Sequence, residues 1–245
     1  MVLEGGSRAP PAAGVRARRQ AVSVSVGVGD VVAHQRALAI HADTLKYIKK
    51  ILQPGLSEKS VFSGIEKYVK ARGVGFSFPP IVASGPHSSY PHAILTERQI
   101  KKNDVVLVDM GIDYFGYKSD LTRMFLLGKI PKLIQHVMNE VREAQRQAIS
   151  KIQPGIPACE VDAQARNYLK KKKLAKYFGH SLGHGVGLEI HEAPRLSVKD
   201  STILKEGMVV TVEPGVYLAH RFGIRIEDMV LVTKNGYQIL SGYIN

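Results

Sequence analysis

Three histidines, His180, His184 and His191, lie among four glycines in the fourteen residues GHSLGHGVGLEIHE, which begin at Gly179 and end at Glu192. Glycine lets the backbone approach a bound group closely, and neutral imidazole is a common ligand of transition metals. Because glycine weakens both helices and strands, this composition predicts a crowded loop around a site rather than a regular element.

Four acidic residues are candidate partners for these histidines. Asp109 ends the apolar segment VVLVD and Glu213 ends VVTVE, and the next acids of interest, Asp120 and Glu227, follow at separations that a hairpin can close. Ionised carboxylates in apolar segments are costly to bury unless they are paired or bound to metal. Four of them in one pocket would repel one another unless divalent cations neutralised them. With His184 as a fifth ligand, the set predicts a site for two divalent ions, and carboxylates with one imidazole favour manganese.

The acids belong to a pattern that occurs twice. The segment VVLVDMG, which starts at Val105, is matched 104 residues later by VVTVEPG, and the tripeptide Gln-Pro-Gly occurs at 53–55 and again at 153–155. Such self-similarity indicates an internal duplication. It predicts an α+β domain of two helix-helix-hairpin halves related by a pseudo-twofold axis, with the acids near that axis.

The spacing of apolar residues predicts the elements of these halves. Helices are expected from Val32 to about Leu52, from the capping residue Ser57 to Gly73, and over 132–152 and 158–173. Extended segments are expected over 77–84, 104–115 and 121–127, with the last two forming a hairpin around Gly116.

Composition sets the protein class. A chain of 245 residues with 44% hydrophobic residues can bury a core, and no apolar run approaches the length of a membrane span. Cys159 is the only cysteine, so no disulfide can form within the chain, which suits a cytoplasmic protein. The formal charge of +13 is scattered along the chain, so we expect a solvated basic exterior rather than a nucleic-acid-binding function.

Residues 1–32 differ from the rest of the chain, because they are rich in arginine and nearly free of acids. We expect a disordered basic tail here, with an organelle-targeting peptide as the alternative. Residues 33–245 are predicted to form a single catalytic domain.

The segments VDMGIDYFGYKSDLTR, GHSLGHGVGLEIHE, VTVEPGVY and GIRIED resemble the pita-bread metallopeptidases, the family of methionine aminopeptidase, Xaa-Pro aminopeptidase and prolidase. The resemblance covers about residues 35–245 and implies the pita-bread fold around a curved antiparallel sheet. It implies that two metals, manganese in preference to cobalt or zinc, are bound, with Asp120 and Glu227 bridging them. The five ligands implied are Asp109, Asp120, His184, Glu213 and Glu227.

The resemblance also implies roles for the remaining candidates. His92 lies on the substrate side, Arg225 supports the site, and His180 and His191 contact the substrate carbonyl or the intermediate. The segments GHGVGLEIHE and SDLTR resemble the proline-specific branch, which implies hydrolysis of the peptide bond before proline in N-terminal Xaa-Pro substrates. In that mechanism one metal holds the free amine, a metal-bridging hydroxide attacks, Glu213 shuttles the proton, and His191 stabilises the oxyanion with His180 nearby.

Two alternatives stay open, namely methionine aminopeptidase-type activity and a non-catalytic peptide- or ribosome-binding member of the fold. Proline-specific members carry a separate N-terminal domain that is often used in dimerisation, whereas only about 35 residues precede the resemblance here. The resemblance therefore leaves open whether the protein is a homodimer and whether it is an aminopeptidase or a dipeptidase.

Overall fold

The computed structural model describes residues 28–244. The predicted basic tail or targeting segment lies outside the described residues except for its last part, because the first helix begins at Val28 rather than at Val32. Asp30 lies in the first turn of that helix, where an acid interacts favourably with the helix dipole. The helices are α1 (Val28–Ile51), α2 (Glu58–Lys70), α3 (Lys132–Ile149) and α4 (Ala158–Lys171).

The strands are short, and every pairing among them is antiparallel within the described residues. Those of the first part of the chain are β1 (Gly75–Phe76), β2 (Ile81–Ser84), β3 (Val105–Met110), β4 (Ile112–Tyr114), β5 (Tyr117–Lys118) and β6 (Leu121–Leu126). Those of the second part are β7 (Gly183–Gly185), β8 (Glu192–Leu196), β9 (Val209–Val212), β10 (Gly215–Leu218), β11 (Phe222–Arg225), β12 (Asp228–Thr233) and β13 (Gly236–Ile239).

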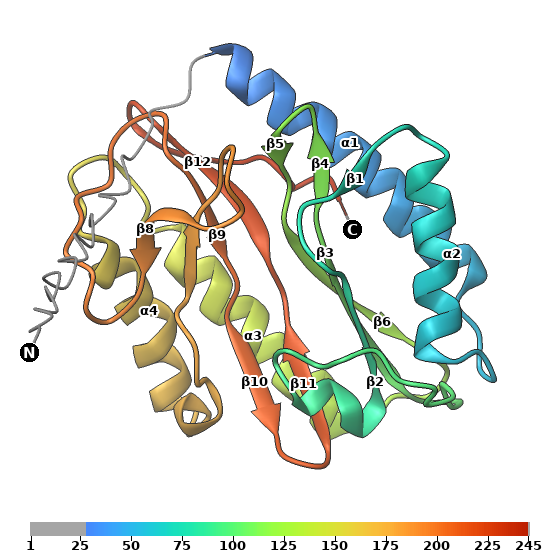
Figure 1. Ribbon diagram of the computed structural model, residues 1–245. Helices are drawn as coiled ribbons and strands as arrows, with labels where there is room; N and C mark the ends of the chain where they lie inside the picture. The colour runs from blue at the N-terminus through green and yellow to red at the C-terminus, as the bar shows by residue number, and fades with distance from the viewer. Residues whose placement is uncertain (1–27, 245) are drawn as a thin grey trace, which may run out of the picture.

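Two similar halves make up the domain. In the first, α1 packs on α2 and the strands run in the order β2-β3-β6; in the second, α3 packs on α4 and the order is β13-β12-β9-β7-β8. The hairpin of β3 and β6 in one half corresponds to the pair β9 and β12 in the other. Figure 1 shows the two helix pairs on either side of the strands. The predicted α+β arrangement of helix-helix-hairpin halves is confirmed.

The predicted strand over 104–115 is not continuous. It breaks at Gly111, where an added Cβ would lie 2.1 Å from the carbonyl oxygen of Ser119. Beyond this point β4 turns aside to pair with β1 and β5. The predicted hairpin turn at Gly116 is present, with φ of +93°, but it joins β4 to β5 while β3 pairs with β6.

The prediction that the histidine-rich segment contains no regular element was wrong. Gly183–Gly185 forms β7, with His184 as its central residue, and β8 begins at Glu192. The glycines serve close packing, because a Cβ on Gly183 would lie 1.9 Å from the carbonyl oxygen of Thr211. In this place glycine allows the strand to form beside its neighbour instead of preventing it.

Each half has its own apolar cluster, which holds the strands in position. The first contains Leu38 and Ile65 from α1 and α2, and the second contains Val141 and Leu169 from α3 and α4. Burial of a side chain of this size contributes roughly 1.5–3 kcal/mol, so the strand ends between the clusters are firmly supported. Over residues 28–244, none of the helices has the length and apolar character that a bilayer crossing requires.

Candidate metal centre

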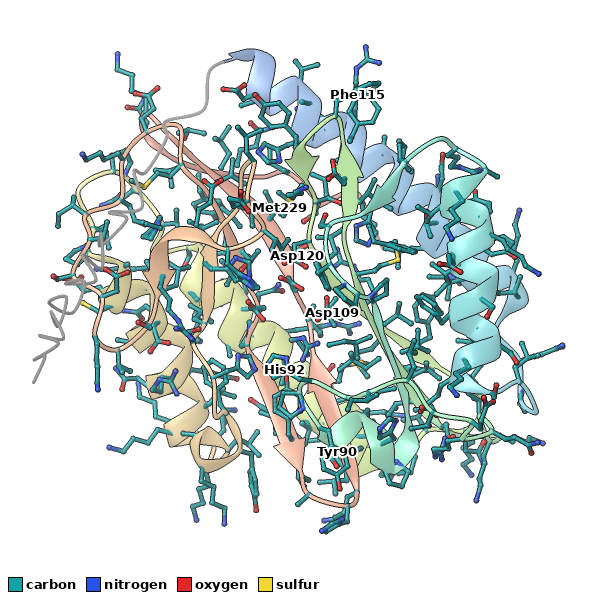
Figure 2. The ribbon with its side chains drawn as sticks, in the orientation of Figure 1. Tyr90, His92, Asp109, Phe115, Asp120 and Met229 are labelled. Carbon is teal, nitrogen blue, oxygen red and sulfur yellow. The ribbon has the colours of Figure 1, made fainter. Side chains whose placement is uncertain are left out.

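The five predicted metal ligands line one cleft of about 600 Å³ between the two halves. Asp109 lies on β3 and Asp120 immediately precedes β6, while the second half contributes His184 from β7 and two glutamates, Glu213 after β9 and Glu227 before β12. Figure 2 shows Asp109 and Asp120 at the centre of the molecule. Residues 118 positions apart in the sequence (Asp109 and Glu227) thus face the same cavity.

The ligand atoms are close enough to share cations. One donor atom from each of Asp120, His184 and Glu227 lies within 4.8 Å of the other two. The Nε2 atom of His184 lies 3.6 Å from Oδ2 of Asp120 and 3.4 Å from Oε1 of Glu213. Asp109 accepts a 2.5 Å hydrogen bond from Arg225 on Oδ2, whereas its buried Oδ1 has no hydrogen-bond partner among the described residues.

Burial, together with the repulsion between neighbouring acids, makes weak acids of three of the carboxyl groups, those of Asp120, Glu213 and Glu227. Burial, followed by the charges of Glu227 and Asp109, raises the pKa of Asp120 well above its ordinary value. Burial likewise raises the pKa of Glu213 to about 8 and that of Glu227 well above its usual range. A cluster of this kind favours bound cations, because positive charge compensates both the burial and the repulsion.

His184 is oriented as a neutral ligand. Burial lowers the pKa of its imidazole to about 4, so its contacts with Asp120 and Glu213 are not ion pairs at neutral pH. Its Nδ1 lies 3.1 Å from the carbonyl oxygen of Gly185, which can only accept, so Nδ1 carries the proton. The lone pair of Nε2 therefore faces the acids, as a metal ligand requires. The donor set fits a divalent cation.

A layer of hydroxyl and guanidinium groups braces the acids. Thr122 donates to Oε2 of Glu227 (2.7 Å) and accepts from Nε of Arg225 (3.0 Å), while Tyr217 accepts a 2.7 Å hydrogen bond from Nη1 of Arg225. The sequence reasoning named Arg225 but missed Thr122 and Tyr217. The signal for Thr122 was its position two residues after Asp120, because alternate residues of a strand face the same side.

The three predicted substrate-side histidines line the same cleft. The Nε2 atom of His180 lies 3.0 Å from the hydroxyl of Tyr217, and the ring of His191 lies 4.3 Å from that of His184. Burial lowers the pKa of His180 to about 4 and also lowers that of His191. His92 is exposed at the rim of the cleft. A neutral His191 can donate a hydrogen bond without adding charge to the site, whereas Nδ1 of His180 lies 2.8 Å from the carbonyl oxygen of Ser181 and carries the proton, so Nε2 accepts from Tyr217.

The loop that carries His92 is anchored by Glu58 at the start of α2. The buried carboxylate of Glu58 accepts hydrogen bonds from the backbone N–H and hydroxyl of Ser84 (2.7 and 2.8 Å) and from Thr96 (2.5 Å), and it contacts Nδ1 of His87 at 2.8 Å. These partners lie on both sides of His92 in the sequence, so they fix the two ends of its loop.

Other residues of the cleft were not singled out from the sequence. Phe78 and Ile81 form an apolar part of the wall, and Arg195 and Ser181 lie on the opposite, polar side. The Nε atom of Arg195 donates to the hydroxyl of Ser181 at 3.1 Å. The cleft thus offers an apolar wall, a carboxylate cluster and a polar wall in one cavity.

Fold and site together define a candidate carboxylate–histidine metal centre at the junction of two repeated halves, and the chain was compared with known proteins. The model of metallopeptidase family M24 matches residues 32–234. The chain belongs to metallopeptidase family M24. The prediction of a pita-bread metallopeptidase with a curved antiparallel sheet is confirmed by this match and by the solved structures that resemble the chain.

Among relatives of known sequence, an Xaa-Pro dipeptidase of Pyrococcus horikoshii is 43% identical over 188 residues, which are 76% of this chain and 54% of the relative. An uncharacterised peptidase of Bacillus subtilis is 40% identical over 208 residues, or 84% of this chain and 59% of the relative. The chain therefore spans little more than half the length of these relatives.

Solved structures give the same result. Prolidase from Pyrococcus furiosus superposes with a TM-score of 0.87 and 38% identity, covering 89% of this chain and 65% of that structure. An X-Pro aminopeptidase from Thermotoga maritima has a TM-score of 0.87 and 34% identity, covering 89% of this chain and 62% of that structure.

Proposed function

We propose that this chain carries the catalytic centre of a metal-dependent exopeptidase that hydrolyses the bond before proline in N-terminal Xaa-Pro substrates. The observation that carries the proposal is the convergence of four acids and one neutral imidazole on a single cleft. Names of relatives support the substrate class, since they include an Xaa-Pro dipeptidase and a prolidase.

Asp109, Asp120, His184, Glu213 and Glu227 are proposed to hold two divalent cations. Oxygen-rich donors with one imidazole favour manganese, with cobalt or zinc as alternatives. When bound, the cations would polarise the substrate carbonyl and increase the acidity of water. The unpartnered Oδ1 of Asp109 and the outward lone pair of His184 support these assignments.

The protein's own groups have separate roles in this proposal. Glu213, whose Oε1 lies 3.4 Å from Nε2 of His184 in the cleft, would be held as a carboxylate by the bound cations; it accepts the proton of the attacking water and delivers it to the leaving amine. Neutral His191 donates a hydrogen bond to the substrate carbonyl as it gains negative charge. His180 lies beside it, with its Nδ1 proton directed at the carbonyl oxygen of Ser181 and its Nε2 accepting from the hydroxyl of Tyr217. Arg225 holds Asp109 and Tyr217 in place.

The apolar wall of the cleft supports the proposal of proline at the second position. The rigid pyrrolidine ring is apolar, and Phe78 and Ile81 provide an apolar surface beside the cluster. His92, which lines the cleft at its rim, is proposed to contact the substrate. Proline also fixes its own φ and lacks an N–H, so a cleft shaped for it needs no acceptor for that group.

The test is hydrolysis of an Xaa-Pro dipeptide by the purified chain, first freed of metal with a chelator and then supplied with manganese. Activity should appear only after manganese addition, and elemental analysis should give about two ions per chain. Asp120→Asn should abolish activity, whereas Asp43→Asn on the exposed face of α1 should leave it unchanged. Activity that persists in chelator or in Asp120→Asn would contradict the proposal.

Methionine aminopeptidase-type activity is the second candidate, because it would use the same five ligands. Turnover of a Met-Ala peptide and an Xaa-Pro peptide under identical conditions separates the two. A non-catalytic peptide- or ribosome-binding role would require neither turnover nor metal uptake. Failure of both peptides with full metal occupancy would favour that role.

A further inference from the structure

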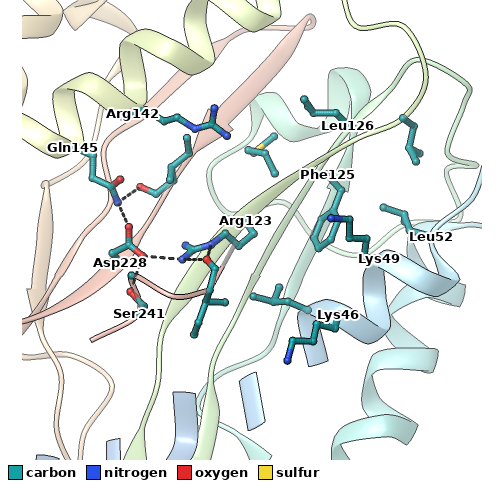
Figure 3. A pocket seen from close by; sticks show the side chains of 16 residues that line it. Lys46, Lys49, Leu52, Arg123, Phe125, Leu126, Arg142, Gln145, Asp228 and Ser241 are labelled. Carbon is teal, nitrogen blue, oxygen red and sulfur yellow. Dashed lines mark hydrogen bonds and ion pairs between the residues drawn. The ribbon is translucent and has the colours of Figure 1, made fainter. Parts of the chain in front are cut away.

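A second large cavity lies away from the metal centre. It has a volume of about 680 Å³ and is shared by α1, α3, strand β6 and the segment 241–244 (Figure 3). The groove, as we name it, has an apolar lining that includes Leu45, Leu52, Phe125 and Ile226. Cavities of this volume are of the size that ligands occupy in proteins.

The groove and the catalytic cleft lie on opposite sides of the chain that joins β11 to β12. Arg225 and Glu227 line the cleft, whereas Ile226 and Asp228 line the groove. Successive side chains of an extended segment point to opposite faces. A ligand in the groove would therefore leave the metal ligands accessible.

The floor of the groove is an open strand edge. Strand β6 is the last strand of the order β2-β3-β6. The carbonyl of Thr122 accepts from the backbone N–H of Glu227, on the side away from β3. Alternate residues of a strand direct their N–H and C=O groups to the same side, so those of Met124 and Leu126 point into the groove. No backbone partner for these groups occurs within residues 28–244.

An uncovered apolar edge of this kind is a site where another strand can pair. Leu126, on this edge, is 40% exposed. Proteins normally shorten, charge or cover such edges because they recruit other chains. Here α1 and α3 flank the edge of β6 and leave a cavity between them. The cavity has room for one extended peptide but not for the edge of another sheet.

The two helices that flank the groove, α1 and α3, each contribute a positive charge to it. Lys49 on α1 and Arg142 on α3 line it from opposite sides and have no hydrogen bond or ion pair within the described part of the chain. Of the other cations, Lys46 is paired with Asp43, and Arg123 is bonded to Asp228 and to the carbonyl oxygen of Ile244. Two cations are therefore left for an anionic group of a ligand.

We propose that the groove binds an extended peptide segment of another protein, rich in alternating apolar and acidic residues, which adds a strand to the free edge of β6. The N–H and C=O groups of Met124 and Leu126 pair with the backbone of the peptide, and its apolar side chains enter the cavity. Its acidic side chains interact with Lys49 and Arg142. This mode of recognition takes affinity from main-chain bonds and specificity from alternate side chains.

Binding can be measured by fluorescence anisotropy with a labelled short peptide of alternating valine and glutamate, blocked at both ends so that an exopeptidase cannot cleave it. The acidic peptide should bind. A peptide with lysine in place of glutamate should bind at least about tenfold more weakly, because its positive charges are repelled by those of Lys49 and Arg142. Peptide binding should protect the amides of Met124 and Leu126 from hydrogen exchange. Binding should be the same with and without a metal chelator.

Matched variants separate charge from fold. The double change Lys49→Glu with Arg142→Glu should weaken binding by at least about tenfold. Lys50→Glu with Lys170→Glu makes the same change in net charge at exposed positions outside the groove and should leave binding unchanged. Both variants alter only exposed side chains, so both should keep the melting temperature of the parent.

The remaining outcomes overturn the proposal. They are no binding of the acidic peptide, equal binding of the lysine peptide, or protection elsewhere in the chain. A further control is the acidic peptide with every second backbone nitrogen methylated, which cannot donate hydrogen bonds to the carbonyl groups of β6. If this peptide binds as tightly as the unmethylated one, strand addition is also overturned. Saturable binding of dodecanoate in place of the acidic peptide would assign the groove to a small amphiphilic anion instead.

Discussion

The two halves of the domain share a scaffold but present different walls to the cleft. In the first half, β2 pairs with β3 and presents Ile81; in the second, β7 pairs with β9 and presents His184. At the start of the second helix, the first half has Glu58, which anchors the loop of His92, and the second has Ala158. The duplication supplies the acids twice, and the differences between the copies make one wall apolar and the other polar.

This asymmetry indicates how a fold made of two similar halves can bind a peptide, whose two ends differ, in one orientation. Four acids alone would form a nearly symmetric site in which a peptide could lie either way. Tyr217, Arg225 and the imidazoles other than His92 belong to the second half, whereas Phe78 and Ile81 belong to the first. Changes that exchange or remove these differences should therefore have unequal effects.

The largest difference in kcat/KM between the two walls is expected when His184→Ala is compared with Ile81→Ala. Loss of the imidazole removes a proposed cation ligand, which we expect to lower kcat/KM by about a thousandfold or more, as loss of several kcal/mol of stabilisation implies. Ile81→Ala should change kcat/KM by less than about tenfold, through KM. Equal losses for both, in protein of measured metal content, would remove the distinction between the walls.

Close packing in β7 should be visible in stability. Gly183→Ala places a Cβ against the carbonyl oxygen of Thr211, and we expect a loss of about 1–3 kcal/mol in the free energy of unfolding. Gly179→Ala meets nothing within 4 Å and should change it by less than about 0.5 kcal/mol. Urea unfolding measures both. A neutral Gly183→Ala would mean that the glycine is not needed for strand pairing.

Bracing of the acids by the second half can be tested with Arg225→Lys. Lysine has no planar fork to contact Asp109, Tyr217 and Thr122 together, so kcat/KM should fall by about 10–100-fold together with metal affinity. Arg221→Lys, on the exposed turn before β11, is the control and should match the parent. Unchanged metal affinity in Arg225→Lys would show that the bracing is dispensable.

Anchoring of the His92 loop belongs to the first half. Glu58→Gln replaces an acceptor of several hydrogen bonds by a group that is half donor, and we expect about a tenfold rise in KM with a smaller change in kcat. Glu66→Gln on the exposed face of α2 is the control. If the melting temperature falls while KM stays constant, the network supports only the fold.

The smallest effect concerns pH. His41 on α1 is fully buried, and burial lowers its pKa from 6.5 to about 3. Because the folded state has the lower pKa, the unfolded state binds more protons, so stability falls as the pH drops below 6.5 and continues to fall toward 3. The loss is at most about 1.4 kcal/mol per pH unit. In α3 the buried polar residue Gln145 does not titrate.

Urea unfolding at neutral pH and at about pH 5 should therefore show a shallower pH dependence for His41→Gln than for the parent. Hydrogen exchange at the lower pH should increase in the first half before the second. Identical pH dependence in the two proteins would mean that His41 is hydrated in the folded state.

Much of the fold was predictable because its signals are local. Apolar periodicity located the four α-helices that lie within residues 28–244, and Ser57 caps α2 as expected. The break at Gly111 and the strand at Gly183 were not predictable, because each depends on a carbonyl oxygen from a distant segment. Composition alone cannot distinguish a glycine that loosens a strand from one that makes room for its neighbour.

The sequence by itself determined which groups are available for chemistry, because the order and spacing of the acids and histidines, together with their duplication, are properties of the chain. Tertiary structure decided how these groups face one another: the tautomer of His184, the bracing by Thr122 and Tyr217, and the open edge of β6. The physical reason is that hydrogen bonds and burial between the halves join residues about a hundred positions apart, whereas sequence patterns report only what neighbouring residues can do.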